Sequence, residues 1–338
     1  MIPTSFFAVV PMVCVVASAI ATMVAEAFRE PGERLPLGPL GAIGLVGAAV
    51  SALRLWNLNA SSFNVVTADN FGLFVTLVLI LVGVLSLAVS SVVIDKEQLP
   101  RGEYYTLMLF ALAGMMLMAT ASDLLVVFLA LEVLSLAVYA LTGLRRQSPV
   151  ASEAALKYFV LGAFSSAFFL YGTALTYGLA GSTRLDRIGR LTAAQAMSPT
   201  PLQVVALGLL LVGFAFKVSA VPFHMWAPDA YEAAPSPVTG FMSTGVKAAA
   251  FAAFARVFLA AVEPLAPFWK PVVWVLAALT KVLGTGAGVT QTNVKRMLAY
   301  SSISHAGFIL VGIEAAAHSG EGATRGLASV LFYVITYA

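Results

Sequence analysis

Long uninterrupted apolar runs dominate the chain, and short polar stretches separate them. A transmembrane helix needs about 20 consecutive apolar residues, whereas a transmembrane β-strand alternates apolar and polar positions over about ten. Because these runs are long and do not alternate, they predict an all-α fold, a polytopic transmembrane helix bundle of roughly ten or eleven helices. The expected helices cover residues 4–27, 36–56, 71–94, 103–121, 123–144, 152–179, 201–222, 237–261, 271–290 and 297–316.

The apolar runs at the two ends of the chain need separate interpretation. The first lacks a positively charged leader and is too long for a signal peptide, so it is expected to remain as a helix. The last begins near residue 326 and stops at Ala338. It is too short to cross about 30 Å of hydrocarbon at 1.5 Å per residue. We therefore expect the C-terminal part of the bundle to be missing from this chain.

Composition supports a membrane protein and excludes several other classes. Of the 338 residues, 60% are hydrophobic and 10% are charged, against about 25% charged in a soluble domain. The net charge of +3 does not indicate a nucleic-acid partner. A single cysteine, Cys14, excludes a disulfide within the chain and a thiolate cluster. The sequence has neither a P-loop nor a dinucleotide-binding motif.

Charged residues inside the predicted helices are the strongest candidates for function. Glu132 lies at mid-span, Lys217 lies inside the apolar segment 201–222, Lys247 lies about ten residues into its span, and Lys157 lies about one turn inside its helix. A charge near the bilayer centre costs about 2.5–3.5 kcal/mol, so such residues usually line a polar pathway or pair with each other. We predict a proton pathway in which Glu132 pairs with Lys217. Two alternatives stay open, since Lys157 can snorkel to the interface and buried charges can simply set helix packing.

Prolines interrupt the region between Lys217 and Lys247. Pro222, Pro228 and Pro235 predict a helix break near residues 222–234. Broken helices at membrane depth are tolerated where they line a water-filled cavity or are buried in protein. Further polar residues are assigned by position: His224, Lys281 and His305 as further members of a relay, Asp229 and Glu232 at the aqueous end of the break, and Lys295 and Arg296 as anchors at a helix end.

The histidines do not form a metal site in the sequence. His224, His305 and His318 are few and scattered, and no His/carboxylate spacing typical of a metal site occurs. We therefore expect neither a metal nor a redox cofactor in this chain.

Two long motifs resemble the antiporter-like membrane subunits of respiratory complex I, namely AFKVSAVPFHMWAPDAYEAAPSPVTGFMSTGVKAAAFAAFARVF and QTNVKRMLAYSSISHAGFILVGI. The segments LEVLSLAVYAL and ALKYFVLGAFSSAFFLYG match the family's earlier motifs, so the resemblance covers residues 104–316. Among these subunits, PDAYEAAPSPVTGFMSTGVKAA is most similar to the N type. The L and M types and the Mrp antiporters usually have a histidine where Tyr231 stands here.

This resemblance implies a fold of roughly fourteen helices with two inverted repeats of five. Residues 1–102 would then be N-terminal transmembrane helices, 103–262 the first five-helix repeat with its broken helix, and 263–338 the start of a truncated second repeat. The family's glutamate and lysine pair would correspond to Glu132 and Lys217, its connecting lysine to Lys247, and its sixth-span lysine to Lys157. Lys281 departs from the family pattern.

The implied function is proton translocation as a membrane-arm subunit of NADH:quinone oxidoreductase in the bacterial inner membrane. Its partners would be the other membrane-arm subunits and the lipid bilayer. Quinone, flavin and iron–sulfur clusters would belong to partner subunits, and this chain would hold no cofactor. The alternatives are a cation/proton antiporter subunit of the Mrp type, and the counterpart subunit of a photosynthetic NDH complex.

Overall fold

The computed structural model describes residues 4–30, 35–195, 198–318 and 321–337, and these are almost entirely helical. Within these ranges, nine helical stretches are long and apolar enough to cross a membrane. The helices are α1 (Val10–Ala27), α2 (Leu37–Leu55), α3 (Asn70–Glu97), α4 (Arg101–Thr120), α5 (Leu124–Thr142), α6 (Pro149–Ala180), α7 (Leu185–Ala194), α8 (Pro201–Lys217), α9 (Trp226–Ala233), α10 (Ser236–Phe241), α11 (Lys247–Ala260), α12 (Ala266–Val289), α13 (Val294–Ala316) and α14 (Glu321–Tyr337).

Short elements of other types connect these helices. A 3₁₀ turn, Thr4–Val9, leads into α1, and another, Glu263–Leu265, leads into α12. A π-helical turn, Met242–Val246, joins α10 to α11. The strands β1 (Ala60–Ser62) and β2 (Val66–Ala68) form an antiparallel pair with Ala60 opposite Ala68. The sequence predicts only a loop there, because three-residue strands carry no periodic signal.

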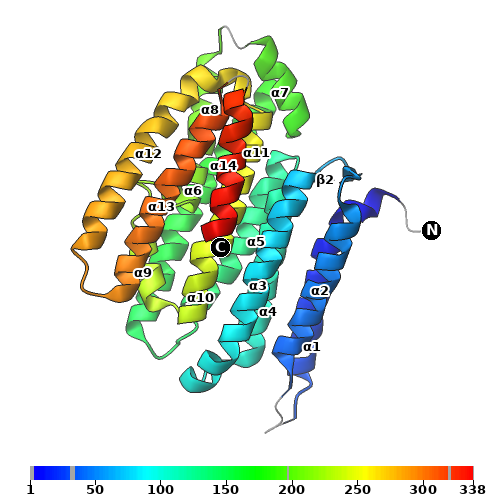
Figure 1. The fold of residues 1–338 in the computed structure, drawn as a ribbon, viewed down its shortest axis with the longest axis vertical. Helices are drawn as coiled ribbons and strands as arrows, with labels where there is room; N and C mark the ends of the chain where they lie inside the picture. Colours follow the sequence, from blue (N-terminus) through cyan, green and yellow to red (C-terminus); the bar gives the residue numbers. More distant parts are fainter. Residues whose placement is uncertain (1–3, 31–34, 196–197, 319–320, 338) are drawn as a thin grey trace.

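The bundle places α1 and α2 at one edge and α12 at the other (Figure 1). Helices α4 and α11 are the most deeply buried, whereas the outer helices expose large apolar side chains such as Val46, Val92 and Trp274. Apolar residues that face outward suit a lipid environment. The all-α transmembrane prediction is confirmed, with most helix limits within a few residues of those expected.

Side chains fix several helix starts. Asp69 accepts a hydrogen bond from the Gly72 amide at 2.8 Å at the start of α3, and Asp123 accepts one from the Leu125 amide at 2.9 Å at the start of α5. Asp123 also accepts a hydrogen bond from the Val126 amide. Asn293 caps α13 in the same way. These caps satisfy backbone amides that have no partner within the helix.

The polar stretch after α6 is not only a loop, because it contains α7. Leu185, Ile188 and Thr192 are buried on one face of α7, and arginines lie on the other. Desolvation raises the pKa of Asp186, but hydrogen bonds from Arg184 and Arg190 together lower it more, so this pKa lies below its usual range. The outer face of α7 is therefore charged at neutral pH. The density of charges concealed this amphipathic helix in the sequence.

The close crossing of α4 and α5 depends on Gly114. A Cβ atom added there would lie 2.8 Å from the backbone nitrogen of Leu134 and 3.0 Å from the carbonyl oxygen of Ala130. We expect Gly114→Ala to force the helices apart and to lower stability by about 1–3 kcal/mol. The matched control is Gly208→Ala in α8, where an added Cβ would meet no atom within 4 Å. Thermal unfolding in detergent measures both, and equal midpoints for the two variants would contradict this account.

Candidate functional site

Lys217 is the last residue of α8 and lies deep inside the bundle. Its side chain is 2% exposed, and its Nζ donates hydrogen bonds to Ser135 Oγ at 2.8 Å and to Tyr158 OH at 3.5 Å. The rings of Tyr139 and Tyr158 lie within about 6 Å of the ammonium, the range in which an aromatic face attracts a cation. The buried ammonium is therefore surrounded by hydroxyl groups and aromatic rings.

The ion pair expected between Glu132 and Lys217 is not formed in this structure. Ser135, one turn along α5 from Glu132, takes the place of the carboxylate as the partner of the Lys217 ammonium. The Oε1 atom of Glu132 is buried and makes no hydrogen bond in the described part of the chain. Residues three apart share a helix face. Glu132 therefore lies on the face that leads to Lys217, but Ser135 makes the contact.

A small cavity adjoins Lys217. Its lining includes Ser135, Gly162, Ser165 and Ser166, and the centre of a water molecule has about 10 Å³ of room inside it. This is close to the minimum volume that one water molecule needs. The small residues Gly162 and Ser165 leave this room beside Lys217, between α5, α6 and α8.

The helix break lies earlier in the chain than expected. Regular helix ends at Lys217 and resumes at Trp226, so the break covers residues 218–225 and not 222–234. Two side chains stabilise it: Thr280 Oγ1 accepts the Val221 amide at 2.9 Å, and Trp226 Nε1 donates to the Phe216 carbonyl at 3.1 Å. The sequence misplaced the limits because residues 218–221 contain no charged residue, proline or glycine that would mark the end of a helix.

The three prolines assigned to the break have different positions. Pro222 lies within the break and is exposed. Pro228 lies in the first turn of α9, where backbone N–H groups have no partner within the helix, so proline loses no hydrogen bond there. The prediction that Pro228 breaks the helix is therefore wrong. Pro235 lies between α9 and α10. His224 lies in the break and is partly buried, and its Nδ1 atom makes no hydrogen bond among the described residues.

Lys247 is the second deeply buried lysine. It begins α11 directly after the π-helical turn and is 2% exposed. Its Nζ donates to both the carbonyl oxygen and the side-chain oxygen of Ser302 in α13, each at 2.6 Å. A π-helical turn has hydrogen bonds from residue i to i+5, so it holds one more residue than an α-helical turn, and it is frequent at functional sites. The extra residue changes the direction of the side chains that follow, Lys247 first among them. The apolar pattern of the sequence does not indicate this turn.

The relay residues expected on α12 and α13 have separate environments. His305 follows Ser302 by one turn of α13 and hydrogen-bonds through Nδ1 to the Tyr333 hydroxyl of α14, so it extends the polar line from Lys247. Lys281 lies apart from this line, with its ammonium 4.0 Å from the centre of the Phe308 ring. Its neighbour Thr280 instead supports the helix break.

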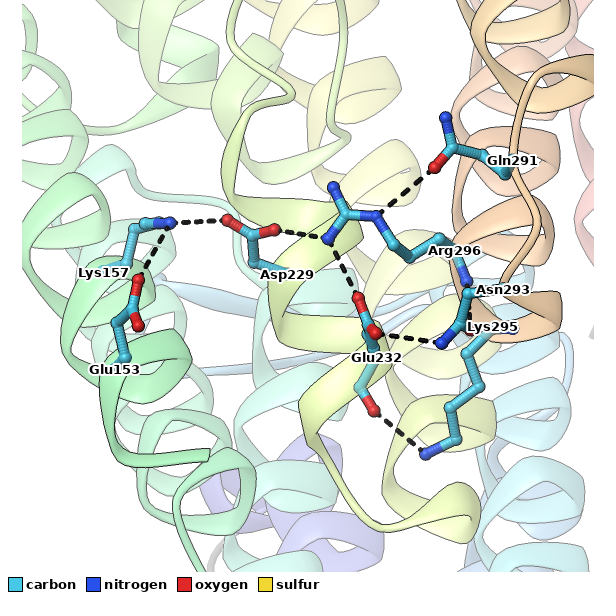
Figure 2. Close-up of polar contacts among 8 residues, drawn as sticks. All are labelled: Glu153, Lys157, Asp229, Glu232, Gln291, Asn293, Lys295 and Arg296. Atoms are coloured by element: carbon cyan, nitrogen blue, oxygen red, sulfur yellow. Dashed lines mark hydrogen bonds and ion pairs between the residues drawn. The ribbon is translucent and has the colours of Figure 1, made fainter. Parts of the chain in front are cut away.

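Lys157 belongs to an ion network at the end of the bundle and contacts neither Lys217 nor Lys247. Its side chain is 42% exposed, and its Nζ lies 2.7 Å from Asp229 Oδ2. The other Asp229 oxygen accepts from Arg296 Nη1 at 2.7 Å, and the same nitrogen donates to Glu232 at 2.9 Å. Figure 2 shows these side chains in one row that joins α6, α9 and α13. Arg296 and Lys295 contact α9 and are more than end anchors.

Carbonyl groups at the C-terminal end of α9 also receive cations. Arg145 Nη1 donates to the Ala233 carbonyl at 3.0 Å, while its Nε and Nη2 bind both carboxylate oxygens of Glu97. Lys295 Nζ donates to the Ala234 carbonyl at 2.7 Å. Cations at this position satisfy carbonyls left open by the helix end and complement its dipole. Sequence reasoning missed Arg145, Ser135 and Ser302, because their partners lie on distant helices.

The part of the chain that the structure describes contains no cluster of three His, Cys, Asp or Glu side chains able to hold a metal ion. The expected lack of a cofactor remains a prediction.

Comparisons with known proteins identify the family. The model of a family described as "NADH:quinone oxidoreductase/Mrp antiporter, TM" matches residues 121–338. NADH-quinone oxidoreductase subunit N of Trichlorobacter lovleyi is 41% identical over 330 residues, which are 97% of this chain and 66% of that protein. Subunit N of Chloroflexus aggregans is 42% identical over 340 residues, 99% of this chain and 68% of that protein. This chain belongs to the subunit N family of NADH-quinone oxidoreductase.

Solved structures of membrane complexes share this fold. A chain of respiratory complex I from Thermus thermophilus with bound aureothin superimposes with a TM-score of 0.78 at 36% identity, covering 97% of this chain and 67% of that one. A chain of an archaeal membrane-bound sulfane sulfur reductase gives a TM-score of 0.84 at 26% identity over 98% of this chain and 69% of that one. The chain spans about two thirds of the length of its relatives, and it is a multi-pass membrane protein.

Proposed function

We propose that this chain moves protons through the membrane as a membrane-arm subunit of a proton-translocating NADH:quinone oxidoreductase in the bacterial plasma membrane. Quinone reduction in partner subunits would drive the transfer, and the flavin and iron–sulfur centres would lie in those partners. The observation that carries the proposal is the pair of buried lysines, Lys217 and Lys247. Each is 2% exposed and contacts oxygen atoms of neutral groups, with no carboxylate within ion-pair distance among the described residues.

The chemistry of these lysines suits proton transfer. A buried ammonium costs free energy in a medium of low dielectric constant, and loss of its proton removes that cost. Hydroxyl groups can both donate and accept, so Ser135, Tyr158 and Ser302 can hold either form of the lysine they contact. Glu132 near Lys217, and His305 near Lys247, would be the groups that exchange protons with each end.

Tyr231 belongs to a cluster of aromatic residues that reaches Lys217. It lies on α9 after the break, is 1% exposed, and packs edge-on against Trp226 at 6.0 Å. Trp226 in turn stacks on Tyr158, a contact of Lys217. Aromatic residues of α6 and α9 thus occupy the space next to Lys217. Under this proposal they exclude bulk water from it.

Lys247→Met in the assembled complex tests the proposal. Reconstituted into liposomes, the variant is expected to transfer electrons to quinone but to move fewer protons per electron, since a positioned acid–base group contributes about 10²–10⁴-fold to a proton-transfer step. The matched control is Lys96→Met, which replaces an exposed lysine at the end of α3. An unchanged proton-to-electron ratio with normal quinone reduction would refute the assignment. Isolation of the chain without redox subunits, together with cation-dependent proton exchange, would favour an Mrp-type antiporter.

A further inference from the structure

The carboxylate of Asp229 connects three helices that are far apart in the sequence. Its two oxygens bind different partners, Lys157 of α6 and Arg296 of α13, each at 2.7 Å (Figure 2). Asp229 itself lies in the first turn of α9, directly after the break. One side chain therefore holds the start of this short helix from two sides.

A second set of contacts between α6 and α9 reaches Lys217. Tyr158 follows Lys157 on α6, and its ring stacks on Trp226 with centroids 4.1 Å apart and the planes within 1° of parallel. Trp226 precedes Asp229 by three residues, so both lie on one face of α9. The Tyr158 hydroxyl contacts Lys217, and the Trp226 indole donates to the carbonyl of Phe216, the residue before Lys217.

The two ends of α9 are held by different interactions. Arg145 and Lys295 bind backbone carbonyls at its C-terminal end, and these bonds do not involve Asp229. Glu232 is bound by Arg296 and by Asn293. The ionic link between α9 and α6 is the bond from Lys157 to Asp229. Removing the charge of residue 229 would therefore loosen the N-terminal end of α9 against α6 and leave the C-terminal end fixed.

We propose that Asp229 is a positioning residue that sets the hydrogen bonds of Lys217 by holding α9 against α6. Through Trp226 and Tyr158, the ion pair between Lys157 and Asp229 determines where the Tyr158 hydroxyl meets the buried ammonium. The consequence for proton transfer rests on the proposed function. The effect of Asp229 on the position of α9 does not depend on the proposed function.

The test uses the assembled complex with Asp229→Asn, Asp229→Glu and, as the matched control, Glu153→Gln. Glu153 is 75% exposed and lies 3.7 Å from the same lysine. Hydrogen exchange of the backbone amides of residues 218–230 measures the coupling directly, and the proton-to-electron ratio measures its consequence. We expect Asp229→Asn to speed this exchange roughly tenfold and to lower the ratio. Asp229→Glu should restore both, and Glu153→Gln should change neither.

The outcomes separate the two proposals. Exchange in Asp229→Asn equal to that of the unsubstituted chain would overturn the positioning role, whatever the proton-to-electron ratio. Faster exchange that Asp229→Glu fails to reverse would also overturn it, since the carboxylate would then not be the cause. Asp229→Asn could speed hydrogen exchange and Asp229→Glu restore it, in a complex whose unsubstituted form moves no protons through this chain. That result would support the positioning role of Asp229 and reject the proposed function. Subunit content of each purified complex shows whether the variant has assembled.

Discussion

Lys217→Met is expected to lower proton transfer through this chain sharply while leaving its fold as stable as before. Methionine has nearly the length of lysine and fills the same space, but it carries no charge and no donor. Ser135 keeps a hydrogen bond to the Leu131 carbonyl, so it is not left without a partner. Replacing a buried charge by an apolar side chain of similar volume is often neutral or stabilising. Function and stability should therefore separate in this variant.

The expected loss is large because Lys217 has no substitute nearby. Proton transfer through this chain should fall by about tenfold or more, measured as the fall in protons moved per electron in liposomes. The midpoint of thermal unfolding should stay within about 3 °C of the original, which corresponds to roughly 1 kcal/mol. Lys96→Met is the control for loss of a positive charge alone. Retained translocation in Lys217→Met would remove Lys217 from the pathway, and a large drop in the midpoint would indicate a structural role.

Arg256→Met is expected to produce the largest loss of stability. Arg256 of α11 is 10% exposed, and its two terminal nitrogens bind both carboxylate oxygens of Asp69 at 2.7 and 2.8 Å. Its Nε also donates to the Ala119 carbonyl at the end of α4. The change would leave Asp69 without its bidentate partner. Breaking one side of such a partly buried pair costs about 3 kcal/mol.

This loss has a structural consequence that can be measured. Asp69 caps α3, so Arg256 ties the start of α3 and the end of α4 to the helix that begins with Lys247. The midpoint of thermal unfolding should fall by roughly 5 °C or more. Arg190→Met is the control, because Arg190 is 77% exposed in its pair with Asp186 and such pairs contribute little. Equal midpoints for Arg256→Met and Arg190→Met would show that the buried pair contributes no more than an exposed one.

The limits of the membrane-spanning helices follow largely from the local pattern of apolar residues. Helices such as α5 and α13 were predicted within a few residues, because bilayer thickness sets the length of an apolar run and a polar residue such as Asp123 marks its start. The depth of Lys217 and Lys247 also followed from their distance to the nearest polar stretch. The charged surface helix α7 was missed, because its short apolar face is hidden among arginines.

The lengths of the apolar runs are enough to predict a bundle of membrane-spanning helices with two lysines in its interior, since both conclusions depend only on how far each residue lies from the ends of its own apolar run. The partners of those lysines depend on tertiary packing. It placed Ser135 instead of Glu132 against Lys217, directed Lys157 outward to Asp229, and began the break at residue 218. Such contacts depend on how neighbouring helices rotate and shift past one another, and hydropathy along one helix carries no information about that.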